Sequence, residues 1–128
     1  MNNTNTVSLA LPAKAEYVSV ARLTASGISS FMGFDFDAIE DIKVSISEVL
    51  GKIIEKAKGT GQVTIIFESH ADSLKINFLT DNDTVSNVFE DEADSFSLAI
   101  VEALMDETDI KKNDKILTTI VKKLGKAV

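Results

Sequence analysis

The chain has 128 residues, of which 45% are hydrophobic and 26% charged, with a formal net charge of −7. This length and composition fit one globular domain, 1–128, large enough to fold without disulfides or a structural metal. The lack of cysteine in the sequence excludes a disulfide framework and cysteine metal sites, and it favours a reducing compartment. The acidic balance opposes nucleic-acid binding, so a protein or a small molecule is the expected partner.

The chain start has no basic region followed by an apolar core, which indicates that there is no secretory signal. No apolar run approaches the roughly 20 residues needed to span a bilayer. We therefore expect a cytoplasmic protein that does not contact a membrane. The nearest basic group is Lys122, Lys123 and Lys126, which we expect at a solvated end of a helix or strand.

The first two predicted elements are an edge strand and a helix. Residues 7–11 alternate between apolar and polar, and Pro12 ends the pattern. Residues 15–31 follow with helical periodicity, and Gly33 stands where a helix often ends. The positions of this helical set are Tyr17, Ala21, Thr24, Ile28 and Phe31, with Val18, Ala25 and Met32 beside them.

A longer second helix is predicted from a cap at Asp35 to about Lys58. Its apolar face consists of Ile39, Ile42, Ile46, Val49, Leu50, Ile53, Ile54 and Ala57. The opposite, polar stripe consists of Asp41, Ser45, Glu48, Lys52 and Glu55. A turn at 59–61 ends the helix.

A hairpin of two alternating strands is predicted next, with 70–72 as its turn. Its inward residues are Val63, Ile65 and Phe67, then Leu74, Ile76 and Phe78. His70, the single histidine of the sequence, is then a solvated turn residue.

The last part of the chain begins with an acidic loop at 81–94. A third helix from Phe96 to about Met105 follows, capped by Asp94 or Ser95. Two more strands are predicted at about 107–111 and 116–121, turning at 113–114. The order of elements predicts an α/β (α+β) two-layer sandwich, with a mixed, mostly antiparallel sheet and about three helices on one face.

Several fragments, taken in this order and spacing, resemble the anti-sigma-factor serine kinases of the GHKL (histidine-kinase-like) ATPase superfamily. The fragments are Leu11-Pro12-Ala13, Glu16-Tyr17-Val18, Arg22-Leu23-Thr24, Ile39-Glu40-Asp41-Ile42-Lys43, Ser47-Glu48 and Glu102-Ala103-Leu104-Met105-Asp106-Glu107. The resemblance covers nearly the whole chain and implies a histidine-kinase-like fold. It also implies a protein that binds ATP, captures a sigma factor and phosphorylates a serine of an antagonist protein.

The resemblance assigns candidate residues to the catalytic and metal positions of that family. Glu48 matches the glutamate that acts as general base. The position of the magnesium-ligating asparagine is Lys52. An ammonium group only donates hydrogen bonds, so it cannot ligate a metal. Lys52 either replaces the charge of the cation or pairs with Glu48 one turn earlier, and we favour the pair.

The adenine and phosphate positions are also altered. Asp81 matches the aspartate that reads adenine, but its partner glycine is Asp83. The two phosphate-loop glycines are Ser95 and Ser97, whose Cβ atoms hold a phosphate away from the backbone. We expect these serines to cap the third helix.

The lid between these motifs, residues 84–94, is short and acidic. Its charges, together with Asp83, are Glu90, Asp91, Glu92 and Asp94. They repel a triphosphate if the loop covers the cleft, and much less if the loop points to solvent. The sequence leaves both arrangements open.

The sequence therefore favours an anti-sigma-like regulatory protein with a degenerate ATP site and little or no kinase activity. No cofactor and no metal ligand are expected, although ATP with magnesium stays open. The resemblance places contact with a sigma factor or an antagonist near Tyr17 and Arg22, and it implies a homodimer. Core packing is an equal interpretation of Tyr17.

Two alternatives remain. The chain can be an active serine-protein kinase, in which Glu48 activates the serine, Asp81 holds adenine and Lys52 replaces the metal charge. The cleft can also bind another small ligand that is less anionic than ATP.

Overall fold

The computed structural model describes residues 4–81, 85, 88–89, 91–110 and 116–125. These residues form a five-stranded sheet in the order β1-β2-β3-β5-β4. The strands are β1 (Asn5–Pro12), β2 (Gln62–Ser69), β3 (Ser73–Thr80), β4 (Glu107–Ile110) and β5 (Ile116–Lys123). Every pairing between them is antiparallel, so the predicted parallel component of the sheet is not found in this part of the chain.

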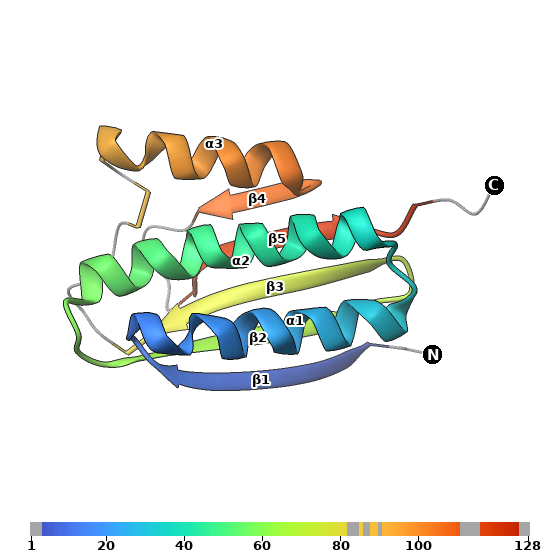
Figure 1. Cartoon of the computed structure of the whole chain (residues 1–128), viewed down its shortest axis with the longest axis horizontal. Coiled ribbons are helices and arrows are strands. Elements are labelled where there is room, and N and C mark those ends of the chain that lie inside the picture. The colour runs from blue at the N-terminus through green and yellow to red at the C-terminus, as the bar shows by residue number, and fades with distance from the viewer. Residues whose placement is uncertain (1–3, 82–84, 86–87, 90, 111–115, 126–128) are drawn as a thin grey trace.

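The helices form the second layer. They are α1 (Val18–Met32), α2 (Phe36–Ala57) and α3 (Ser95–Leu104), with short 3-10 turns at Ala15–Tyr17 and Glu92–Asp94. Helices α1 and α2 run across one face of the sheet, and α3 packs beside α2 near β4 (Figure 1). The structure thus confirms the two-layer α+β fold. None of the helices within the described ranges is long and apolar enough to cross a membrane.

The ends of α1 and α2 lie where the sequence predicts them. Gly33 follows α1 with φ of 97°, a left-handed conformation that glycine adopts without steric cost. The Asp35 carboxylate caps α2 by accepting a hydrogen bond of 2.8 Å from the Ala38 amide. Lys58 ends α2 with φ of 53°.

The core lies between α2 and the central hairpin. Ile65 pairs with Phe78, and Phe67 pairs with Ile76, so the inward residues of β2 and β3 form two layers. The predicted inward residues of both strands are fully buried. The fully buried α2 residues Ile42, Ile46, Val49 and Ile53 belong to the same core cluster.

Two positions on the helices differ from the prediction. Phe31 was expected on the apolar face of α1 but is 80% exposed, because the buried stripe is narrow and centred on Ala21, Ala25 and Ile28. Ser45 was expected on the polar stripe of α2 but is fully buried. Helix α2 packs against α1, α3 and β5, so more of its circumference is covered than a single apolar face predicts.

The C-terminal lysines differ in their exposure to solvent. The Lys122 side chain is mostly buried, with Nζ 3.3 Å from Asp41 Oδ2 and a hydrogen bond to the Leu104 carbonyl at the end of α3. The prediction of a solvated Lys122 is therefore wrong, whereas Lys123 is exposed as expected. Lys126 and the turn predicted at 113–114 lie outside the described residues.

Ser45 provides a test of the core. Its hydroxyl forms no hydrogen bond with any described residue although it is fully buried. We expect Ser45→Ala to raise the free energy of unfolding by up to about 1 kcal/mol, because it removes a buried, unsatisfied polar group. Ile46→Ala on the same helix should lower it by about 2–5 kcal/mol. Urea denaturation measures both, and a loss of stability in Ser45→Ala would contradict this packing.

Candidate functional site

The predicted site residues Lys52 and Ser95 come from two helices that meet through ion pairs. Asp94 directly precedes α3, and its carboxylate lies between two lysines of α2. The distances are 3.2 Å from Lys52 Nζ to Asp94 Oδ1 and 3.0 Å from Lys56 Nζ to Asp94 Oδ2. Asp94 is only 3% exposed. The start of α3 is thus held against the second half of α2 by one shared carboxylate.

Two further acids extend this arrangement. Lys52 Nζ is 3.1 Å from Glu55 Oε2, and Lys56 Nζ is 3.2 Å from Asp91 Oδ2. We call the five residues Lys52, Glu55, Lys56, Asp91 and Asp94 the Asp94 cluster. Glu55 and Asp91 are exposed, so solvent screens their contribution. The contacts of the buried Asp94 are screened least.

The cluster changes the acidity of its members. Burial alone would raise the pKa of the Asp94 carboxyl group, but contacts with Lys56 and Lys52 outweigh this effect and lower its pKa below the ordinary 3.8. The contact with Glu55, then that with Asp94, raises the pKa of Lys52. The contact with Asp94 raises the pKa of Lys56. All three groups are therefore charged at neutral pH.

The predicted pair of Lys52 with Glu48 is wrong. Lys52 instead extends toward Glu55 and Asp94. Lys56 is a site residue that the sequence does not single out. Its position one turn after Lys52, on the same face of the helix, is the one feature of the sequence that points to it. Asp94 was considered only as a cap or as a lid charge. Its attraction to two lysines depends on a contact between helices that sequence spacing does not reveal.

The two serines do not cap α3 with their side chains, contrary to the prediction. The Ser95 hydroxyl donates a 2.7 Å hydrogen bond to the Glu92 carbonyl oxygen, and Ser97 is buried. No side-chain cap is present, because the 3-10 turn at Glu92–Asp94 leads directly into the helix. The serines lie at the start of α3, next to the Asp94 cluster.

Asp81 lies at the exposed end of the β2–β3 pair. Its carboxylate accepts a 3.0 Å hydrogen bond from the Gln62 amide at the start of β2. No contact among the described residues joins it to the Asp94 cluster. Its predicted neighbour Asp83 lies outside the described residues.

The described part of the lid does not simply extend into solvent. Val85, Val88 and Phe89 are buried and belong to the hydrophobic core cluster. Of the lid acids that the structure describes, Asp91 and Glu92 are exposed and Asp94 is buried and paired. The described residues of the lid are therefore held by apolar contacts and by the Asp94 cluster.

Glu48, the candidate general base, is half-buried on α2. Its carboxylate forms no hydrogen bond and no ion pair with another residue in the described part of the chain. It is one turn before Lys52, whose ammonium group pairs with Glu55 and Asp94 instead. The carboxylate is therefore available to an external group.

The candidate partner residues lie on and before α1. Tyr17 is half-buried and packs against the core, which supports its packing role. Arg22 Nη1 donates hydrogen bonds to Ser47 Oγ at 2.6 Å and to the Lys43 carbonyl at 3.3 Å. The guanidinium has no acidic partner among the described residues, so its charge remains available to a carboxylate.

Lys52 stands at the position of the family's magnesium-ligating asparagine, and the Lys56 ammonium group lies beside it through the shared Asp94. Such groups cannot ligate a metal while they are charged. The donor set at this point thus differs chemically from the oxygen ligands that magnesium takes. Elsewhere in the described ranges, no group of three or more histidine and acidic side chains is placed to hold a metal ion.

The α+β fold, with three helices on an antiparallel sheet, is consistent with a GHKL-type ATPase domain. The chain is similar to proteins named serine-protein kinase RsbW. The protein from Bacillus cereus strain B4264 is 43% identical over 72 residues, which are 55% of this chain and 45% of the relative. The Bacillus mycoides KBAB4 protein is 42% identical over the same length.

The Listeria innocua protein of that name is 40% identical over 81 residues, which are 61% of this chain and 51% of the relative. The chain thus spans about half the length of the curated relatives it matches. No protein-family model matches it.

Asp94 provides the test of the cluster. We expect Asp94→Asn to lower the free energy of unfolding by about 1–3 kcal/mol at neutral pH, because two lysines lose their shared buried carboxylate. Because the folded-state pKa of Asp94 is lowered, its contribution is complete above the ordinary pKa of 3.8 and is lost as the pH falls through the lowered value. Urea denaturation of the wild type and of Asp94→Asn, at several pH values between neutral and acid, measures the difference in their free energies of unfolding.

Asp91→Asn is the matched control. Its side chain is 71% exposed and contacts Lys56 alone within the Asp94 cluster, so the cost should stay below about 1 kcal/mol. Equal losses in the two variants, or a pH-independent loss in Asp94→Asn, would contradict the special role of Asp94.

Proposed function

We propose that this protein is an anti-sigma-type regulator that acts by binding a protein partner, and that its nucleotide site is degenerate. The similarity to serine-protein kinase RsbW supports the regulatory class. The chemistry of the cleft supports the loss of efficient ATP use. A cytoplasmic location and a homodimer are part of the same proposal.

The Asp94 carboxylate between Lys52 and Lys56 carries this proposal. Lys52, at the family's metal position, and Lys56 beside it share this carboxylate, and each also pairs with a second acid of the same chain. A triphosphate would have to displace Asp94 and would then lie close to Glu55 and Asp91. At about 4 Å and an effective dielectric near 20, each such like-charge contact costs about 4 kcal/mol before screening.

The hydrophobic anchoring of the lid supports the same conclusion. To admit a nucleotide, the lid would have to move, and the buried side chains of Val85, Val88 and Phe89 are part of the core. Exposing one such side chain costs roughly 1.5–3 kcal/mol. Opening would therefore oppose ligand binding, in addition to the loss of the ion pairs.

For the partner, we propose a sigma factor or its antagonist, contacted through Arg22. The Arg22 guanidinium is held in place by Ser47 and the Lys43 carbonyl, but no acid of the described chain neutralises it. An acidic side chain of a partner would form an ion pair with this guanidinium. Tyr17 contributes to the same region through its exposed part.

An active serine-protein kinase is the second candidate, favoured by one observation. The Glu48 carboxylate forms no hydrogen bond or ion pair among the described residues, so it can accept a proton from a substrate hydroxyl within reach. In this case the Asp94 cluster opens when ATP binds, and Lys52 replaces the metal charge.

Calorimetry with ATP and magnesium distinguishes the two candidates. We expect no binding by the wild-type protein, and at most weak binding by the triple variant Lys52→Asn, Ser95→Gly, Ser97→Gly, which restores three family residues but keeps Asp94 and the buried lid residues. Micromolar binding by the wild type would overturn the degenerate site. Transfer of phosphate to a candidate antagonist, abolished by Glu48→Gln, would establish the kinase.

Complex formation tests the partner. The protein should form a complex with a sigma factor or antagonist of its host on size-exclusion chromatography, to the same extent with and without ATP and magnesium. Arg22→Ala should weaken the complex at least tenfold, by loss of a charge-assisted contact.

Lys14→Ala, at an exposed position before α1, should leave the affinity unchanged. Circular dichroism of Arg22→Ala checks that the helices remain folded. The absence of any complex with the host's sigma factors and antagonists would contradict the proposed class.

A further inference from the structure

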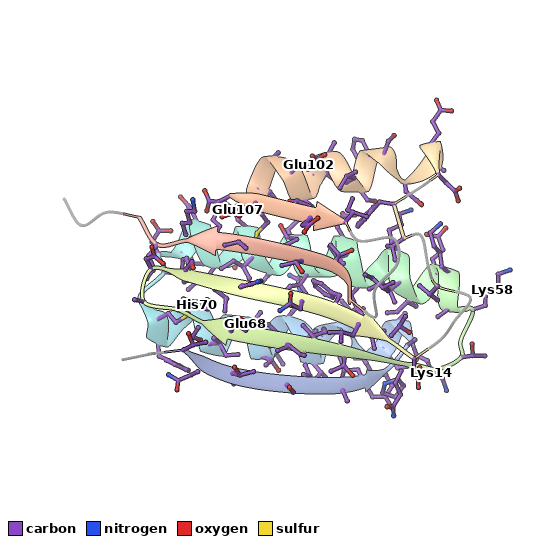
Figure 2. All side chains as sticks on the ribbon, turned by 180° about the vertical axis from the view of Figure 1, so that it is seen from behind. Lys14, Lys58, Glu68, His70, Glu102 and Glu107 are labelled. Carbon is purple, nitrogen blue, oxygen red and sulfur yellow. The ribbon has the colours of Figure 1, made fainter. Side chains whose placement is uncertain are left out.

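A concave site lies on the opposite face of the sheet from the helices. It has a volume of about 630 Å³, within the range of roughly 300–1,000 Å³ that small-ligand pockets occupy. The outer face of the sheet is turned toward the viewer in Figure 2. Two of the residues that line the site, Glu107 on β4 and His70 beyond β2, are labelled there at the same end of the sheet. We call this site the outer groove.

The strand register fixes the arrangement of the groove. Val121 of β5 pairs with Lys75 of β3 on one side and with Glu107 of β4 on the other. Thr119 pairs in the same way with Asn77 and Asp109. Adjacent strands are about 4.8 Å apart, so the backbones that carry Lys75 and Glu107 are about 10 Å apart. Val121 and Thr119 form the floor between them.

Hydrogen bonds hold one wall of the groove in place. The two oxygens of Glu68 are occupied, because Oε2 accepts a 2.7 Å hydrogen bond from Asn77 and Oε1 is 3.3 Å from His70 Nε2. The Thr119 hydroxyl donates a 2.7 Å hydrogen bond to Asn77 Oδ1. This chain of contacts crosses β2, β3 and β5 and orders the polar side chains beside the floor.

The occupation of Glu68 has a consequence for Lys75. Glu68 is directly opposite Lys75 across β2 and β3, and would be its natural partner. No hydrogen bond or ion pair joins the Lys75 side chain to another residue in the described ranges. Lys75 therefore lines the groove without an acidic partner bonded to it in that part of the chain, and Asp72, at the turn between β2 and β3, lines the groove on the same side.

The opposite wall is acidic. Glu107 and Asp109 both line the groove, two residues apart on the same face of β4. The Glu107 carboxylate has a distant contact of 3.7 Å with the exposed Lys123. Lys75 on β3 and Glu107 on β4 thus lie on opposite sides of an apolar and hydroxyl floor.

We propose that the outer groove binds a small zwitterion of the amino-acid or dipeptide type. The ammonium group of the ligand would contact Glu107, and its carboxylate would contact Lys75. A ligand with a single charge would pair with only one of these two side chains. The proposal does not depend on the proposed function of the helical face, because the groove lies on the other side of the sheet.

The experiment is a titration of the whole protein with glycylglycine, followed by amide chemical shifts and by calorimetry. We expect saturable shifts at β3, β4 and β5 around Lys75, Glu107 and Thr119. N-acetyl-glycylglycine, which lacks the ammonium group, and glycylglycinamide, which lacks the carboxylate, should each bind at least tenfold more weakly. The absence of saturable shifts at millimolar glycylglycine, shifts elsewhere on the protein, or equal binding of the blocked peptides would overturn the proposal.

Two pairs of variants test the walls separately. Lys75→Met and Glu107→Gln should each weaken glycylglycine binding about tenfold, by removal of one charge-assisted contact. Lys14→Met and Glu102→Gln carry the same substitutions at exposed positions away from the groove and should bind like the wild type. Unchanged affinity in both wall variants would overturn the proposal, and the control pair shows that the effect is local.

Discussion

The packing of α2 on the β2–β3 hairpin is the contact on which the other parts of the structure depend. Its buried side chains meet the two inward layers of the sheet. With that face fixed, each flank of α2 carries a polar contact with a different element. Ser47 contacts Arg22 of α1, Asp41 contacts Lys122 of β5, and Lys52 and Lys56 contact Asp94 at the start of α3. A shift of this helix along the sheet would disturb all three.

The fold was predictable from the sequence because its signals are local. The alternation in β2 and β3, the cap at Asp35 and the left-handed Gly33 each depend on a few neighbouring residues. The exceptions, Phe31 and Ser45, lie at the margins of helical faces. Their exposure depends on which neighbouring helix covers each margin, and periodicity within one helix does not contain that information.

The candidate site was predictable only in part, for a similar reason. The resemblance identified Lys52 and the serines as departures from a nucleotide site, and it drew attention to the acidic lid. It did not reveal that Asp94 lies between Lys52 and Lys56, because an ion pair between residues about 40 positions apart follows from the packing of α3 on α2. The outer groove, likewise, depends on a register between three strands, which side-chain patterns of single strands do not fix.

The position of Asp94 has a consequence for physiology. A regulator whose active shape requires a bound nucleotide responds to the energy charge of the cell, because its occupancy follows the supply of that metabolite. In the function proposed above, a carboxylate built into the polypeptide takes the place of the nucleotide, and its local concentration is set by the covalent chain and never falls. A regulator of this design would hold its partner equally well in starved and in growing cells, and control would have to come from the abundance of the competing proteins.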